Sequence, residues 1–336
     1  MMSIQQKTIL YGAVYGAGFM GTTHLAGYHK LDHVAIVGVI DPVKQRAEAA
    51  AVPYGLETFS SIAEAAGSGR LDFIDICIPT PFHVQAVKEA FDHDCHVLVE
   101  KPITASAEDL KRMQDLVSQS SKRFMAAHVC RFIAPYVFAK KTIESGRLGK
   151  PTLFTGKRYS ERPDWSLDDW INNRRISGGT LVDLSIHDVD IANWFLGTPV
   201  RMYASEAVWE KNGPAHVFET LEYENSRAAH VEASHLMPAG YGLDYEFQLV
   251  LERGLISCKI GPDTQSVREM SDGQWNDIDT SEFVTFSEPY TEEVFHFTES
   301  LRTGEPFRIS FKDALTAVRS VLFLRDAVEK HTVIKW

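Results

Sequence analysis

Short apolar segments alternate with helix-like stretches along the first third of the chain. The apolar segments contain almost no polar residues, which is typical of parallel strands buried on both faces of a sheet. Helices between consecutive strands supply the crossover connections that such a sheet needs. The pattern therefore predicts a doubly wound parallel α/β domain over residues 1–125. The predicted strands are Ile9–Tyr15, Val34–Ile40, Phe73–Ile78 and His96–Glu100, and the helix-like stretches include Phe19–Lys30 and His83–Asp92.

The pattern changes after Phe124. Helices are predicted at Ala134–Ser145 and at Phe311–Glu329, and an apolar helix ends near Phe195. Between the last two, strands with alternating polar and apolar residues, such as Ala228–Ser234, follow one another without intervening helices. Such a succession is typical of an antiparallel sheet. We therefore expect residues 126–336 to form an α+β domain with a largely antiparallel, open sheet.

The charge balance excludes two classes of partner. The chain has 34 Lys and Arg against 45 Asp and Glu, a net charge of −11, which repels both a phosphate backbone and anionic lipid. The longest apolar stretch, Val34–Ile40, has seven residues, far below the roughly 20 of a membrane-spanning helix. We expect neither nucleic acid nor a membrane as a partner.

The cysteines favour a reducing compartment. They lie far apart and form no CxxC pair, which also argues against a zinc module. The segment Met1–Lys7 has no apolar core and no small-residue cleavage site, so a cytoplasmic protein is expected. The polar run Asp92–His96 is interpreted as a turn leading into a strand, because adjacent strand residues point to opposite faces, and no metal is predicted. The four cysteines are Cys77, Cys95, Cys130 and Cys258.

A glycine-rich turn follows the first predicted strand. Gly16, Gly18 and Gly21 have the spacing GxGxxG, with Phe19 and Met20 between them, and a helix-like stretch begins there. Gly16 would permit a tight turn, Gly18 a close approach of a pyrophosphate, and Gly21 close packing of helix on sheet. The helix N-terminus favours an anion at the same place. The motif in this context predicts a Rossmann-type dinucleotide site.

Asp41 ends the second predicted strand, 20 residues after Gly21. An acid there can accept hydrogen bonds from the adenosine ribose hydroxyls and would repel the 2′-phosphate of NADP. The same residue precedes Pro42 and would also suit the N-cap of the next helix. We favour ribose contact and NAD as the cofactor, while Lys44 and Arg46 keep NADP as the alternative.

Lys101 directly follows the strand His96–Glu100, at the edge of an open sheet where ligands bind. A lysine there could take a hydroxyl proton from an alcohol or return it to an alkoxide. On the residues alone, a lysine beside a glutamate is more often a solvated ion pair. Both interpretations stay open at this point.

Asp183 and His187 are four residues apart in a predicted helix and would share one face of it. Asp190 and Trp194 continue the same stripe, and apolar residues flank it on both sides. A polar stripe between apolar flanks does not fit the solvent face of an amphipathic helix. The stripe therefore lines a cavity or forms a buried hydrogen-bonded network.

Three segments resemble motifs of the Gfo/Idh/MocA oxidoreductases, the family named for glucose-fructose oxidoreductase and inositol dehydrogenase. Ile78–His83 (IPTPFH) is similar to TPxxxH, with Ile78 in place of the usual Thr. His96–Pro102 (HVLVEKP) is similar to HVLCEKP. Gly178–Asp190 (GGTLVDLSIHDVD) is similar to GGxLxDxxxHxxD. The resemblance extends over nearly the whole chain.

The resemblance implies a Rossmann domain followed by an α+β domain whose open sheet forms a homodimer or homotetramer. It implies hydride transfer between nicotinamide and a secondary alcohol or ketone of a sugar, an inositol or a related polyol. Lys101 would be catalytic, His187 would exchange a proton or bind a hydroxyl, and Asp183 would accept from a hydroxyl. The implied cofactor contacts are the glycine turn, Asp41, Arg46, Ile78, Pro79, His83, Glu100 and Lys101; softer candidates for substrate contact are His128, Trp170 and Arg175.

Two alternatives remain. A relative that kept the Rossmann site without turnover would be a cofactor-sensing protein, which the presence of both Lys101 and His187 disfavours. An NAD-dependent glycoside hydrolase would oxidise its sugar transiently and recycle the cofactor.

Overall fold

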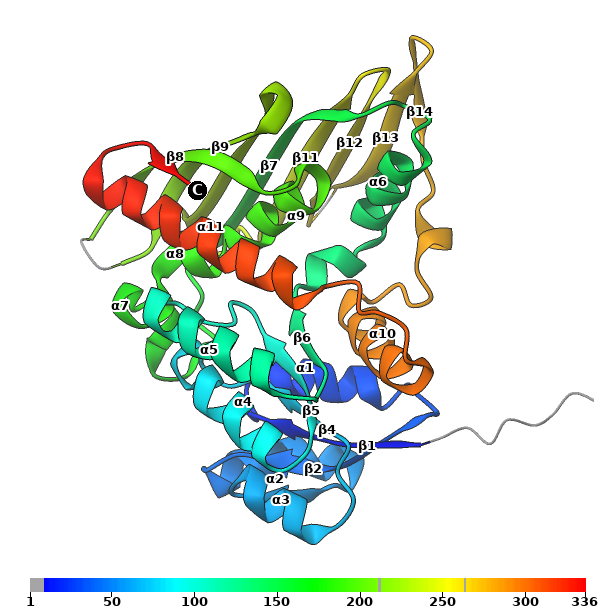
Figure 1. Ribbon diagram of the computed structural model, residues 1–336, viewed down its shortest axis with the longest axis vertical. Helices are drawn as coiled ribbons and strands as arrows, with labels where there is room; N and C mark the ends of the chain where they lie inside the picture. Colours follow the sequence, from blue (N-terminus) through cyan, green and yellow to red (C-terminus); the bar gives the residue numbers. More distant parts are fainter. Residues whose placement is uncertain (1–8, 211–212, 263) are drawn as a thin grey trace, which may run out of the picture.

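The computed structural model describes residues 9–210, 213–262 and 264–336, and the segment Met1–Lys7 lies outside them. Within this part of the chain the strands form a six-stranded and a nine-stranded sheet. The six-stranded sheet occupies the lower half of the molecule in Figure 1 and the nine-stranded sheet the upper half. No helix in the described ranges is both long and apolar enough to cross a lipid bilayer.

The first sheet is parallel, with strand order β3-β2-β1-β4-β5-β6 and helices on both of its sides (Figure 1). This confirms the predicted doubly wound sheet. The chain reverses its direction of winding between β1 and β4, and ligands of such sheets bind outside the carboxyl ends of the strands at this point. The strands are β1 Leu10–Tyr15, β2 Val34–Ile40, β3 Glu57–Phe59, β4 Phe73–Ile76, β5 His96–Glu100 and β6 Phe124–Ala127; the helices are α1 Phe19–Tyr28, α2 Lys44–Ala51, α3 Ile62–Ser68, α4 His83–Asp92 and α5 Ala107–Gln119.

The second sheet has the order β14-β13-β12-β11-β7-β10-β9-β8-β15. β7 and β10 run parallel, and the other described neighbours run antiparallel, which confirms the predicted sheet type. Alternation in β10 buries Ala229, Val231 and Ala233 against the helices. The strands are β7 Pro151–Glu161, β8 Pro199–Val208, β9 Ala215–Tyr223, β10 Arg227–Met237, β11 Leu243–Leu251, β12 Gly254–Gly261, β13 Thr264–Ser271, β14 Gln274–Asp277 and β15 Ile334–Lys335.

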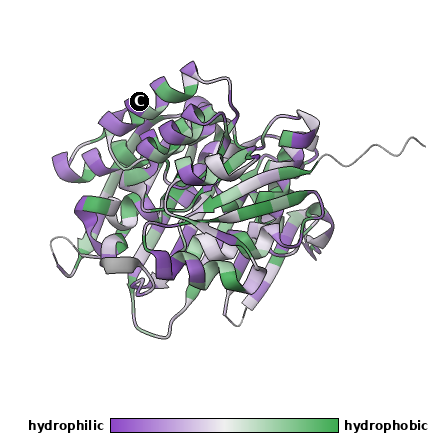
Figure 2. Cartoon of the chain, turned by 90° about the horizontal axis from the view of Figure 1, so that it is seen from below, coloured by the Kyte–Doolittle hydropathy of each residue, from purple (hydrophilic) through white to green (hydrophobic). Residues whose placement is uncertain are grey.

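Two late helices tie the sheets together. α10 (Pro289–Thr303) packs on α1, and Phe297 makes an edge contact with Phe73 beneath it. α11 (Phe311–Lys330) lies between the sheets and contacts both α5 and β8 (Figure 1). Apolar residues, green in Figure 2, are concentrated in the central strands, whereas the outer helices carry more purple, hydrophilic turns. The boundary after residue 125 stays a prediction, since α10 lies against the first sheet.

The predicted continuous helix through Asp183 and His187 is wrong. Residues 184 and 185 interrupt it, so α8 (Gly179–Asp183) and α9 (Ile186–Leu196) are separate helices. The backbone N–H groups of Leu184 and Ser185 both donate to the Thr180 carbonyl. The remaining helices of the second half are α6 (Ala134–Ser145) and α7 (Arg174–Ser177).

Glu219 of β9 forms a hydrogen bond with Ser185 at this interruption. The Ser185 hydroxyl lies 2.6 Å from the Leu181 carbonyl oxygen and 2.7 Å from Glu219 Oε1. A hydroxyl has one hydrogen and a carbonyl only accepts, so the Glu219 carboxyl has to supply the second hydrogen. Burial raises the pKa of Glu219 to about 8, in keeping with a protonated carboxyl.

Glu219→Gln is expected to make folding stability less dependent on pH. The raised pKa means that wild-type stability falls as pH rises from about 4.5 to about 8, because the unfolded chain ionises first. An amide donates to Ser185 without ionising, so the variant should match wild type near pH 5 and exceed it by roughly 3 kcal/mol near pH 8. Urea unfolding at both pH values measures this. Glu222→Gln, on the same strand with a side chain that is 44% exposed and paired with Arg201, is the control. Equal pH dependence in wild type and Glu219→Gln would contradict the protonated carboxyl.

Candidate active site

A cavity of about 1320 Å³ lies at the carboxyl ends of the strands of the first sheet and is closed on its other side by the second half of the chain. It brings together most of the residues predicted from the sequence. From the first half it is lined by Gly16, Gly18, Phe19, Met20, Asp41, Arg46, Ile78, Pro79, Glu100 and Lys101, and from the second half by Trp170, Arg175, Asp183 and His187.

The three glycines of the turn are needed for different reasons. Gly16 has φ +112°, and a Cβ there would lie 2.5 Å from the Cys77 carbonyl oxygen. A Cβ on Gly21, which lies behind the cavity wall, would lie 1.8 Å from the Gly16 carbonyl oxygen. A Cβ on Gly18 would meet no atom within 4 Å. The fold itself therefore requires Gly16 and Gly21, whereas only a ligand can require Gly18.

Asp41 joins the glycine turn to the second strand. Its Oδ2 accepts from the Ala17 N–H at 3.1 Å and its Oδ1 from the Val43 N–H at 2.8 Å. α2 begins at Lys44, and its N-cap position is Val43, so Asp41 does not occupy the N-cap. The carboxylate is held in place at the cavity wall, where it can still accept from a ligand.

Lys101 reaches across the cavity to the second half of the chain. Its Nζ donates to the Asp183 carbonyl at 2.9 Å and lies 3.3 Å from Asp183 Oδ1. Its backbone N–H donates to Glu100 Oε2 at 2.9 Å, which fixes the end of β5. The Lys101 side chain is only 16% exposed, so this is a shielded ion pair at the cavity rather than a solvated one.

His187 lies on the first turn of α9, beside this pair. Burial, together with the positive charges of Lys101 and Arg158, holds its pKa well below the usual range. The imidazole is therefore neutral at pH 7, and its Nδ1 lies 3.6 Å from Cys130 Sγ. His187, Lys101 and Asp183 together give the cavity one cation, one carboxylate and one neutral donor or acceptor.

The polar stripe divides into two halves. Asp183 and His187 line the cavity, whereas Asp190 is fully buried and receives two hydrogen bonds of 2.8 Å from Arg131. The Arg131 guanidinium lies 5.2 Å from the centre of the Trp194 ring. Both interpretations of the stripe thus apply, each to one end of it.

Two predicted histidines lie outside the cavity lining. His83 Nε2 lies 2.8 Å from the Ile78 carbonyl oxygen and Nδ1 lies 3.1 Å from that of Pro102, so the ring joins the two loops behind the cavity. Burial lowers the pKa of His83 to about 4. His128 is buried, and neither of its ring nitrogens has a hydrogen-bond partner among the described residues. Direct contact of these side chains with a ligand is therefore not supported.

Sequence reasoning missed several polar residues of the cavity, and two of them carry an ionisable ring. His235, near the end of β10, and Tyr290, at the start of α10, both line it. Burial lowers the pKa of His235 to about 4, so this ring is neutral as well. Neither residue belongs to a motif, and the only available signal was their position at the end of an element.

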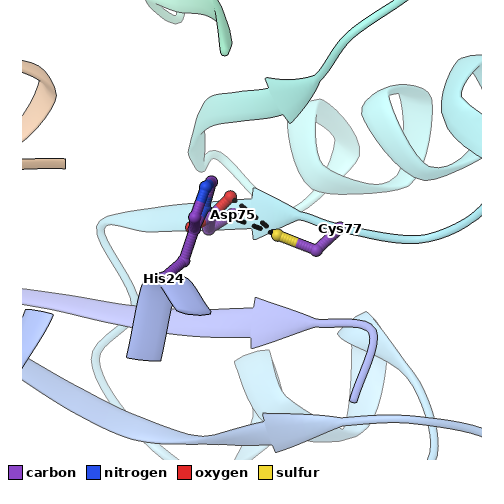
Figure 3. A group of neighbouring side chains, drawn as sticks. All are labelled: His24, Asp75 and Cys77. Carbon is purple, nitrogen blue, oxygen red and sulfur yellow. Dashed lines mark hydrogen bonds and ion pairs between the residues drawn. The ribbon is translucent and has the colours of Figure 1, made fainter. Parts of the chain in front are cut away.

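A cluster around the buried His24, at the wall of the cavity, also escaped prediction. His24 Nδ1 lies 2.8 Å from Asp75 Oδ2 and 3.5 Å from Cys77 Sγ (Figure 3). His24 Nε2 faces Glu100 Oε1 at 3.4 Å and Glu293 Oε2 at 4.0 Å. Two ligands of one zinc ion would be separated by about 3.4 Å, so the 2.8 Å contact is a hydrogen bond. We interpret the cluster as a charge network centred on His24.

Comparison with known proteins assigns the chain to a family. Residues 11–128 match the model described as "Oxidoreductase family, NAD-binding Rossmann fold", and residues 136–257 match the "GFO/IDH/MocA C-terminal domain". The chain therefore belongs to the Gfo/Idh/MocA oxidoreductase family.

Named relatives include inositol dehydrogenases. The chain is 28% identical to scyllo-inositol 2-dehydrogenase (NAD(+)) of Bacillus subtilis, over 87% of this chain and 86% of that protein. It is 27% identical to inositol 2-dehydrogenase of Rhizobium meliloti, over 98% of each. A crystal structure of a putative myo-inositol dehydrogenase from Sinorhizobium meliloti has a TM-score of 0.82 at 23% identity, over 97% of this chain and 99% of that one. This likeness supports the same fold.

Gly18→Ala and Gly21→Ala should separate ligand binding from folding. Gly18→Ala is expected to leave the melting temperature unchanged and to weaken NAD binding at least about tenfold, because its methyl group would meet the pyrophosphate. Gly21→Ala should lower the melting temperature, since its Cβ has no room beside Gly16. Calorimetry measures both quantities, with Gly67→Ala, an unobstructed position, as the control. Wild-type NAD affinity in Gly18→Ala would refute the pyrophosphate assignment.

Proposed function

We propose that this protein is an NAD-dependent dehydrogenase that oxidises a secondary alcohol of an inositol, a sugar or a related polyol, or reduces the corresponding ketone. The observation that carries the proposal is the Lys101–Asp183 contact. It joins a lysine at the end of a Rossmann strand to an acid of the second half, in one cavity with the glycine turn and Asp41. The names of the inositol dehydrogenase relatives support the polyol class.

NAD, when bound, supplies the hydride acceptor. The residues present fit it: the open space at Gly18 and the N-terminus of α1 suit the pyrophosphate, and Asp41 suits the adenosine ribose. Arg46 lines the same cavity and would lie on the adenosine side of the cofactor. Ile78, Pro79 and Glu100 line its other end near Lys101 and would border the nicotinamide.

Lys101 is the acid–base group in this proposal. In its neutral form Nζ takes the proton of the substrate hydroxyl as hydride leaves the same carbon, and in the reverse direction its ammonium returns that proton to the alkoxide. Asp183 orients Nζ and accepts a hydrogen bond from a neighbouring substrate hydroxyl. His187 contacts the reacting or an adjacent oxygen. Because polyols carry several adjacent hydroxyls, such a row of donors and acceptors fits this substrate class.

Trp170 and Arg175 form the far wall of the cavity in this proposal. The Arg175 guanidinium forms no hydrogen bond or ion pair with the described residues, so it is available to donate to substrate oxygens. The Trp170 ring offers an apolar surface for the C–H face of a sugar. His128, buried behind the wall, acts at most through its neighbours.

We also propose that the open face of the second sheet joins copies of the chain into a homodimer or homotetramer. Leu153, Tyr203 and Phe218 are each at least 37% exposed on three of its strands. The four cysteines are free thiols, which supports a cytoplasmic location. The proposed division of labour is a cofactor domain over residues 1–125 and a substrate and assembly domain over residues 126–336.

Lys101→Ala should lower kcat at least about a hundredfold and leave NAD affinity within about threefold of wild type, because it removes only the acid–base group. The measurement is NADH formation with inositols, aldoses and sugar acids, alongside calorimetry with NAD. Lys101→Arg is the matched control, which keeps the charge but cannot act as a base at neutral pH. Near-normal turnover in Lys101→Ala would refute the mechanism.

The same assay distinguishes the alternatives. Cleavage of a glycoside without net NADH would indicate the hydrolase, and NAD binding without either reaction would indicate the sensing protein. Net NADH from a free polyol supports the proposed dehydrogenase.

Asp41→Asn should reduce the preference for NAD over NADP about tenfold, because it removes the negative charge that repels the 2′-phosphate and nearly preserves the shape of the side chain. The ratio of kcat/KM with the two cofactors measures this, and any general loss of activity cancels in the ratio. An unchanged ratio would contradict the ribose assignment.

A further inference from the structure

We propose that Cys130 fixes the tautomer of His187, so that Nε2 carries the hydrogen and His187 acts as a neutral hydrogen-bond donor to a substrate oxygen. Cys130 is thus a positioning residue, and His187 is excluded from the role of general base at Nε2. The tautomer follows from the hydrogen bonds and the burial of these side chains, whereas its catalytic consequence rests on the proposed function.

The contact that carries the proposal is between His187 Nδ1 and Cys130 Sγ, 3.6 Å apart. Cys130 lies in the turn Val129–Phe132 that follows β6, and its side chain is buried. No other described residue forms a hydrogen bond with the His187 ring. His187 lines the cavity, so Nε2 is the nitrogen left for a ligand.

The direction of this hydrogen bond follows from the other partner of the thiol. Arg158 Nη2 donates to Cys130 Sγ at 3.3 Å, and a guanidinium can only donate. The sulfur therefore already acts as an acceptor. If His187 Nδ1 also donated to it, the thiol hydrogen would have no acceptor in the described surroundings. With the thiol donating to Nδ1, all three groups are satisfied.

Arg158 cannot turn away from this arrangement. Its Nε donates to Asp188 Oδ2 at 2.7 Å and its Nη2 lies 3.2 Å from Asp188 Oδ1. Both side chains are almost completely buried, so releasing Arg158 would leave an unpaired charge in the interior. Burial raises the pKa of Cys130 to about 12, which keeps the thiol hydrogen in place at neutral pH.

A fixed tautomer matters because His187 is neutral. Its pKa is held well below the usual range by burial and by the charges of Lys101 and Arg158, and the other ring nearby, His128, also has a lowered pKa. A neutral imidazole has a single N–H, and its other nitrogen only accepts. With Nδ1 accepting from Cys130, that N–H is at Nε2 and faces the cavity. Lys101 is then the residue that accepts the proton of the substrate hydroxyl.

The first test is the tautomer itself, read from the ¹⁵N shifts of histidine-labelled protein in its NAD complex, with His187→Gln to assign the signals. We expect the hydrogen on Nε2 in wild type and in Cys130→Ser, because a hydroxyl also accepts from Arg158 and donates to Nδ1. Cys130→Ala removes the donor and should give a signal displaced toward the Nδ1–H form. Hydrogen on Nδ1 in wild type, or no displacement in Cys130→Ala, would overturn the proposal.

The second test is turnover of the polyol that wild type oxidises fastest. We expect kcat to fall about tenfold in Cys130→Ala and to stay within about threefold of wild type in Cys130→Ser, with KM for NAD unchanged in both. Melting temperatures show whether either variant is merely less stable. Equal kcat in the two variants would overturn the catalytic role of Cys130. If no substrate is turned over while the tautomer is as expected, the proposed function fails and the positioning by Cys130 stands.

Discussion

A buried cation needs an acid beside it, and three such pairs hold the segment 183–190 in place. Lys101 contacts Asp183, Arg158 contacts Asp188, and Arg131 contacts Asp190. The cations come from the loop after β5, from β7 and from the turn after β6. Removing one partner of such a pair leaves an unpaired charge in the interior, which typically costs about 3–5 kcal/mol. One short segment is thereby fixed to both sheets at once.

These pairs determine what the cavity can do. Asp183 is one of the anchored positions and His187 lies next to another, Asp188, so both side chains are held before a ligand arrives. Preorganised groups need no rearrangement during a reaction. The interruption at residues 184 and 185, supported by Glu219, lets α8 and α9 present these two side chains from separate helices. This arrangement cannot be inferred from the net charge of −11, because it depends on only three cations, each paired with an acid.

Local patterns in the sequence were sufficient for the sheet types, the glycine turn and the position of Lys101. The strand lengths and apolar runs reflect burial, and the spacing of Gly16, Gly18 and Gly21 reflects sterics within one turn. What escaped prediction depends on partners distant in sequence. At the helix interruption, Ser185 forms a hydrogen bond with a carboxyl group of β9. The His83 ring contacts two backbone carbonyl oxygens instead of the cavity. The His24 network combines side chains from four elements. No periodicity encodes these contacts.

The electrostatics of the cavity also explain why two nitrogen bases can lie side by side and have different roles. His187 lies close to both Lys101 and Arg158, so a proton on its ring would add a third positive charge, and its lowered pKa keeps the ring neutral. Lys101 Nζ contacts the carbonyl oxygen and the carboxylate of Asp183, which hold the amine in place beside this ring. Asp183 thus places the lysine amine beside a neutral ring, so the two nitrogen bases have different surroundings.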